Sequence, residues 1–183
     1  MATKSSNTGA IAQATGKSWE AWSADLSAAD AQKLTHKEIA QLAESLMSAE
    51  VSNTGWWAQS VAVAFEQEIG RRLPGQGQDG TFQGSTTATL HTDLDGALER
   101  WVQATRDLSD FNGQHMTDGP NISSSQRWRY WRAAFSDGSK VHVDIGAKGE
   151  KTTISVNITK AHSAEAVSSW KSFWRQVLAQ AKN

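Results

Sequence analysis

The chain of 183 residues contains no cysteine. This absence excludes disulfide bonds, thiolate metal ligands and cysteine nucleophiles together, and it fits a protein of the cytoplasm. An excess of charge of one sign is also missing, because 18 basic and 19 acidic residues give a formal net charge of −1. Proteins dedicated to nucleic acids usually carry a basic excess, so the sequence predicts no nucleic-acid partner.

Long hydrophobic runs are equally absent. No stretch approaches 18 apolar residues, so the sequence predicts no membrane span. The first residues are small and polar and lack the apolar core of a signal peptide. We therefore expect a cytoplasmic protein.

Motifs for catalysis or cofactor binding are absent or stand in the wrong context. Residues 15–18 end like a phosphate-binding loop, but the required glycine five residues before Gly16 is missing. Residues 75–80 match the dinucleotide glycine pattern, yet they follow an expected helix and precede an expected strand, which reverses the order that the motif needs. The five histidines show no metal-ligand spacing. We predict no catalytic residue, no metal site and no cofactor.

The first part of the chain carries helical periodicity. Residues 1–14 are predicted to form a flexible tail and residues 15–72 a helical domain of three helices. Ser18 is an expected N-cap, and Thr35 with Glu38 forms a capping box, in which each side chain bonds a free backbone amide at the helix start. A Gly/Pro-rich linker over 71–80 ends this domain, and residues 81–183 form a second one.

After the linker the hydrophobic period changes from about 3.6 to 2. The pattern predicts a strand over 82–91, a helix over 94–104, three antiparallel strands within 127–159 and a long helix over 163–181. Residues 105–120 show no period and are predicted to be loop. The fold class is therefore α+β: an N-terminal three-helix segment followed by an antiparallel sheet wrapped on a long C-terminal helix.

One predicted strand alternates cations and rings. Along residues 127–132, Arg127, Arg129 and Trp131 face one way and the residues between them the other. Such a stripe could stack bases and hold phosphates. The near-neutral charge favours a strand buried by its rings instead, with arginines at the rim.

Nine tryptophans against one tyrosine are the most unusual feature of the composition. Trp57, Trp101, Trp170 and Trp174 all fall on apolar helical faces, where such large rings usually fill a core. Rings of this size also line apolar ligand cavities.

The second half resembles the START-like, or SRPBCC, helix-grip superfamily, and within it the homologues of the heat-shock ATPase activator and the polyketide cyclase-like proteins. The resemblance rests on four segments, at residues 98–101, 135–143, 152–158 and 166–174. Residues 15–22, 34–39 and 55–61 are similar to a small helical domain of unknown function that precedes such domains in bacterial proteins. The usual domain of this superfamily has further strands between the early helices and the segment at 135–143. Here only residues 105–126 occupy that place, so the helix-grip domain is expected to be shortened, with an open sheet edge.

The resemblance implies an apolar cavity between the sheet and the last helix and carries no catalytic residue. Our leading hypothesis is a non-enzymatic module that binds a small hydrophobic ligand at six residues: Trp101, Trp131, Val143, Val156, Trp170 and Trp174.

Two alternatives remain open. A cyclase- or dehydratase-type enzyme would need a titratable group in the cavity, and strand parity points His142 and Asp144 away from it. A protein-interaction module, either a homodimer or a complex with another protein, would use the open edge or the adjacent Trp56 and Trp57.

Overall fold

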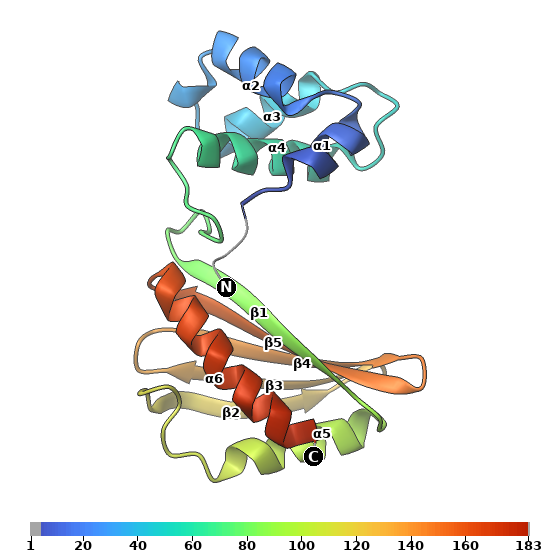
Figure 1. Ribbon diagram of the computed structural model, residues 1–183, viewed down its shortest axis with the longest axis vertical. Coiled ribbons are helices and arrows are strands. Elements are labelled where there is room, and N and C mark those ends of the chain that lie inside the picture. The colour runs from blue at the N-terminus through green and yellow to red at the C-terminus, as the bar shows by residue number, and fades with distance from the viewer. Residues whose placement is uncertain (1–4, 183) are drawn as a thin grey trace. The chain divides into compact units, whose positions relative to one another are not determined.

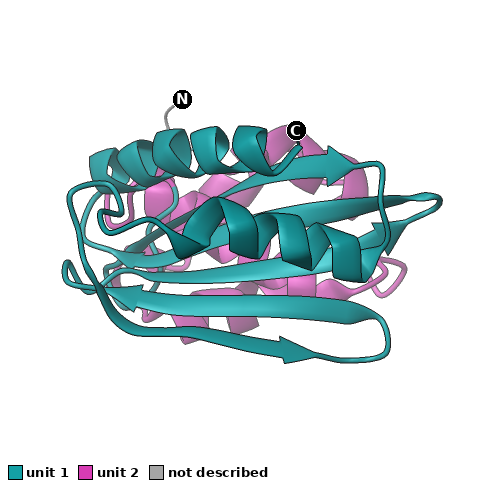
Figure 2. Ribbon diagram, turned by 90° about the horizontal axis from the view of Figure 1, so that it is seen from below, with its two compact units in different colours: residues 1–3, 75–183 teal, residues 4–74 magenta. Residues whose placement is uncertain are grey.

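The computed structural model describes residues 5–182, which divide into two compact units, coloured separately in Figure 2. The first ends at Pro74 and is called the helical unit; the second begins at Gly75 and is called the sheet unit. This boundary lies inside the predicted linker over 71–80. The assignment of the two parts as separate domains stays a prediction.

The helical unit contains four α-helices and one short 3-10 helix among its described residues (Figure 1). They are α1 (Thr8–Thr15), α2 (Trp19–Ala28), η1 (Ala31–Lys33), α3 (His36–Ser45) and α4 (Thr54–Glu68). Ser18 caps α2 by accepting a hydrogen bond from the Ala21 amide, and Thr35 and Glu38 form the predicted capping box of α3.

Helix α1 is a correction to the predicted flexible tail over 1–14 and to the count of three helices. Asn7 starts it, because its side chain accepts a hydrogen bond from the Ala10 amide at 3.0 Å. Ile11 anchors it with 2% of its surface exposed. One large apolar residue in eight gives little periodicity, and for this reason the sequence pattern missed the helix. Residues 1–4 of that predicted tail lie outside the described residues.

A buried carboxylate closes the end of α4. The Glu66 side chain is only 6% exposed and pairs with three groups: His36 Nδ1 at 2.9 Å, Arg71 at 2.8 Å and Arg72 at 3.0 Å. Burial by itself raises the pKa of this carboxyl, but the three partners outweigh it and hold the pKa below its ordinary value of 4.5. The cluster ties the start of α3 to the residues that follow α4.

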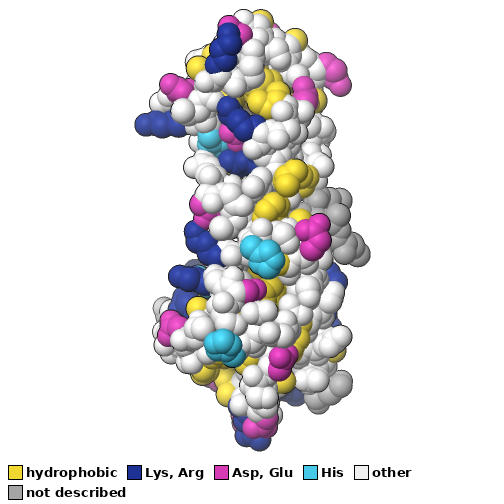
Figure 3. Space-filling view, turned by 90° about the vertical axis from the view of Figure 1, so that its left-hand side faces the viewer, with side chains coloured by type: hydrophobic (Ala, Val, Ile, Leu, Met, Phe, Trp, Pro, Cys, Tyr) yellow, Lys and Arg dark blue, Asp and Glu magenta, His cyan; other side chains and the backbone are white. Residues whose placement is uncertain are grey.

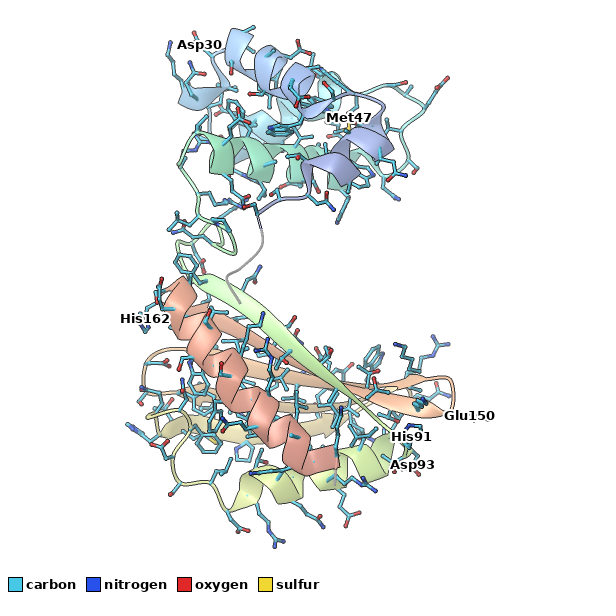
Figure 4. All side chains as sticks on the ribbon, in the orientation of Figure 1. Asp30, Met47, His91, Asp93, Glu150 and His162 are labelled. Carbon is cyan, nitrogen blue, oxygen red and sulfur yellow. The ribbon has the colours of Figure 1, made fainter. Side chains whose placement is uncertain are left out.

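The sheet unit contains five strands and two helices among its described residues. They are β1 (Phe82–Leu90), α5 (Leu94–Arg106), β2 (Met116–Ser124), β3 (Trp128–Phe135), β4 (Lys140–Lys148), β5 (Lys151–Ala161) and α6 (Ala164–Lys182). All neighbouring strands are antiparallel, in the order β1-β5-β4-β3-β2. Asp93 caps α5 through the Gly96 amide, at the point where Figure 4 places it after β1.

Strand β2 was not predicted, since residues 105–120 were expected to be loop. It pairs with β3 along the edge of the sheet, for example Ile122 with Trp131, and almost all of its residues are exposed. A strand that buries no complete face needs no strict alternation of apolar and polar residues. Its sequence therefore carries only a weak signal.

Both helices of the sheet unit lie over the same face of the sheet, as Figure 2 shows, and Figure 1 shows α6 crossing it diagonally. The space between holds the core of this unit, built from alternate residues of the strands and the apolar sides of α5 and α6. Gly84 brings α6 close to β1, because a Cβ at this position would lie 2.5 Å from Val167 Cγ1. The predicted α+β class, with a long C-terminal helix on an antiparallel sheet, is thus confirmed.

Candidate functional site

The structure brings the six predicted cavity residues together in the core of the sheet unit. Each is at most 1% exposed. The ring of Trp174 lies at its centre, with ring centroids 5.5 Å from Trp101, 6.0 Å from Trp131 and 5.8 Å from Trp170. Val143 and Val156 pair across β4 and β5. These side chains therefore fill space between sheet and helices, and their role in ligand binding stays a prediction.

Open space lies beside this cluster. A cavity of about 360 Å³ opens between the end of α5, the following loop and strands β2 and β3. We call it the β2-edge cavity. Its lining residues are Val102, Thr105, Arg106, Leu108, Ser109, Phe111, His115, Met116, Pro120, Ile122 and Trp131. Of the six predicted residues, only Trp131 contributes to this wall.

Aromatic contacts hold the floor of the cavity in place. Trp131 packs edge-on against Trp101, with centroids 5.8 Å apart. Phe111 lies 5.3 Å from Phe135 and 6.1 Å from Trp174. A rigid apolar wall of this kind costs little conformational freedom when a ligand binds.

The far wall of the β2-edge cavity is Ile122. It lies opposite Trp131 on β2 but remains 49% exposed, because neither helix of the sheet unit covers that part of the strand. Sequence reasoning missed this wall together with β2. The available signal was the recurrence of apolar Met116, Pro120 and Ile122 at even positions, which the polar residues between them obscure.

Polar groups near the cavity are few and mostly engaged elsewhere. The Thr105 hydroxyl donates to the Trp101 carbonyl at 2.9 Å, and Arg106 Nε pairs with Asp107 at 3.2 Å. The indole nitrogens of Trp101 and Trp174 are buried and find no hydrogen-bond acceptor among the described residues. A buried donor without an acceptor is costly, and neither of these two residues lines the cavity.

The fourth tryptophan of the cluster is anchored differently. Trp170 Nε1 donates to Asp137 Oδ2 at 3.0 Å, which ties α6 to the turn between β3 and β4. Burial raises the pKa of Asp137, but hydrogen bonds from Ser139 and Trp170 and the nearby His162 outweigh it, so the pKa lies below its ordinary value. This carboxylate serves to hold the fold together.

The titratable pair considered for catalysis lies on the uncovered face of the sheet. His142 is exposed, and Asp144 Oδ2 accepts a hydrogen bond from Asn157 Nδ2 at 2.8 Å. Within residues 5–182, no group of three or more His, Asp or Glu side chains could hold a metal ion. No helix in this part of the chain is long and apolar enough to cross a membrane.

The predicted interface residues lie at the start of α4. Trp56 is 63% exposed, whereas Trp57 is half-buried, and their rings meet edge to face at 4.4 Å. They border a groove of about 290 Å³ between α1 and α4, lined by Ser6, Asn7, Ala10, Ile11, Trp56, Trp57, Gln59, Ser60 and Val63. Figure 3 shows cations and anions interspersed over one side of the molecule, with small hydrophobic areas between them.

Comparisons with known proteins include a weak structural likeness. No family profile matches the sequence, and no curated protein matches it either. Among solved structures, the chain is similar to DynU16, a protein in the dynemicin biosynthetic locus, with 14% identity and a TM-score of 0.36. The alignment covers 55% of this chain and 45% of DynU16, so the chain spans less than half the length of that protein.

Proposed function

We propose that the sheet unit binds a small hydrophobic ligand in the β2-edge cavity. The observation that carries the proposal is the cavity itself: about 360 Å³, walled by Trp131, Phe111, Val102 and Ile122. This volume is at the small end of the range for ligand pockets, which is about 300–1,000 Å³. The proposed site lies at the edge of the sheet, and Trp131 is the one residue of the predicted group that lines it.

The chemistry of the wall supports binding without catalysis. Apolar ligand surface buried there contributes about 25 cal/mol per Å² before the costs of association. More specifically, we propose that the sheet unit is a ligand-binding module of the SRPBCC-like, helix-grip type.

Native mass spectrometry of the freshly purified protein tests for a resident ligand. The expected result is an additional mass that disappears on denaturation. A titration with the apolar dye Nile red gives the affinity, and Ile122→Trp is expected to weaken it at least tenfold by filling the cavity. Leu46→Trp is the matched control, because Leu46 is similarly exposed at 40% but lies in the helical unit. Equal dye affinity in the Ile122→Trp variant would contradict the proposal.

A second candidate function rests on Trp56. The exposed Trp56 ring borders the groove between α1 and α4. The same surface therefore carries both a protruding side chain and a groove that could receive one. A two-fold contact between copies needs such a self-complementary surface. We propose a homodimer of the helical unit, with Trp56 of each copy in the groove of the other. Light scattering should then give a dimer mass that Trp56→Ala converts to a monomer mass; a monomeric wild-type protein at high concentration would exclude it.

A further inference from the structure

The face of the sheet that α5 and α6 leave uncovered has a distinct composition. Because side chains alternate between the two faces of a strand, the positions opposite the buried core residues share this face. We call them the outer face: Trp128, Tyr130 and Arg132 on β3; Lys140, His142, Asp144, Gly146 and Lys148 on β4; Lys151, Thr153, Ser155 and Asn157 on β5.

Trp128 is held against this face while much of its ring stays accessible. It pairs with Gly146 across β3 and β4, and a Cβ on Gly146 would lie 2.3 Å from Trp128 Cζ3. The indole therefore occupies the space that the side chain of any residue other than glycine would fill at position 146. Gly146 is buried beneath it, yet Trp128 itself remains 44% exposed. The result is a positioned aromatic surface open to solvent.

A second ring stands two residues further along the same strand. Tyr130 carries the Arg132 guanidinium over its ring at 4.7 Å, and Arg132 also donates to the Ser123 hydroxyl at 3.1 Å. Positions i and i+2 of a strand are about 6.7 Å apart. Stacked bases in a duplex strand are about 3.4 Å apart, so two rings at this spacing suit bases that are unstacked from each other.

Charge on the outer face is biased to one sign. Its positions carry four cations, Arg132, Lys140, Lys148 and Lys151, against one carboxylate, that of Asp144. A second carboxylate, Asp118, lies on the neighbouring edge strand β2. Lys148 and Lys151 pair across the β4–β5 hairpin next to Gly146, and the only carboxylate of that turn is Glu150, at the hairpin tip in Figure 4. The other carboxylates of the sheet unit lie in helices, loops and turns: Asp79, Asp93, Asp95, Glu99, Asp107, Asp110, Asp137 and Glu165.

We propose that the outer face binds single-stranded nucleic acid, with bases stacking on Trp128 and Tyr130 and phosphates at Arg132, Lys148 and Lys151. The whole-chain charge of −1 predicted no such partner, but that sum mixes both faces of the sheet with the helical unit. Binding depends on the charge that a strand of phosphates meets locally, and here the cations and the rings share one face.

The test is fluorescence anisotropy with end-labelled dT and rU 12-mers at low salt, using the full chain. We expect saturable binding and a loss of about tenfold or more in affinity for Trp128→Ala, since stacking on one ring carries a large share of the affinity for each base. Leu46→Ala is the control, a change at an apolar residue of the helical unit with a similar exposure of 40%, and should leave the affinity unchanged.

The double variant Lys148→Gln/Lys151→Gln should weaken binding and flatten its salt dependence, by about 0.7 in the slope of log K against log salt for each lost phosphate contact. Circular dichroism of each variant confirms that the sheet is intact. The proposal is overturned if the 12-mers do not bind at low salt, or if Trp128→Ala binds them as tightly as the wild type. Salt-independent binding of a neutral oligosaccharide at Trp128, with none of the 12-mers, would overturn it as well.

Discussion

The two units of this chain stabilise themselves by different means. The helical unit has a core of mostly small and aliphatic residues around Trp22 and Phe65, and it buries the Glu66 carboxylate against His36, Arg71 and Arg72. The sheet unit packs rings on rings and leaves two indole N–H groups without an acceptor among the described residues. The difference teaches that the core of one unit includes a buried charge cluster, whereas the core of the other depends mainly on the packing of its rings.

The largest effect is expected at the centre of the aromatic cluster. Trp174→Ala removes a ring that contacts Trp101, Trp131 and Trp170, and such truncations in a core cost about 3–5 kcal/mol. Chemical denaturation, followed by the fluorescence of the remaining tryptophans, measures the loss. Leu46→Ala, at a position of the helical unit that is 40% exposed, should cost less than about 1 kcal/mol. A similar small loss for Trp174→Ala would mean that the cluster does not carry the stability of the sheet unit.

A smaller but pH-dependent effect is expected at Glu66. Glu66→Gln leaves the arginines without their anion and should cost about 3 kcal/mol at pH 7, near the lower end for a broken buried pair, since Arg71 is partly solvated. The pKa of Glu66 is lower in the folded state than in the unfolded state, so its contribution is present above pH 4.5 and is lost as the pH falls through the folded pKa.

Melting temperatures measured between pH 7 and pH 3 check this sign. The wild type should lose more stability on acidification than Glu66→Gln, and hydrogen exchange should locate the extra loss in α3 and α4. If the melting temperatures of the two proteins fall in parallel with pH, the Glu66 cluster does not make the stability of the helical unit depend on pH.

The smallest effects contrast two glycines of the same sheet. Gly84→Ala places a methyl group 2.5 Å from Val167 in the packed layer under α6, so we expect a loss of about 1–3 kcal/mol. Gly146→Ala meets only the exposed ring of Trp128, which can swing away, so stability should change by less than about 1 kcal/mol. Thermal unfolding measures both, and the reverse order of losses would contradict the packing described for the two faces.

Sequence patterns predicted the parts of this fold in which local preference and burial agree. The caps at Ser18 and Thr35 and the alternation along β4 and β5 are such parts, and the α+β class follows from them. Helix α1 and strand β2 were missed because each buries too few side chains to impose a period. The six predicted cavity residues were correctly grouped in space, but no pattern can tell whether large rings leave a hollow or fill it. The β2-edge cavity depended on the strand that sequence analysis could not find.

The strand order has a consequence for the way the sheet unit is made. Strand β1 pairs only with β5, so that Leu90 pairs with Thr152, 62 positions later in the chain, while β2, β3 and β4 each pair with the next strand in sequence. Pairings between distant residues form late, because the chain must first lose the freedom of the intervening loop. During synthesis, the meander from β2 to β5 can assemble as it emerges, whereas β1 waits as an unpaired strand until β5 is complete. A ribosome that stalls before residue 151 would therefore expose a nascent chain in which β1 has no partner strand.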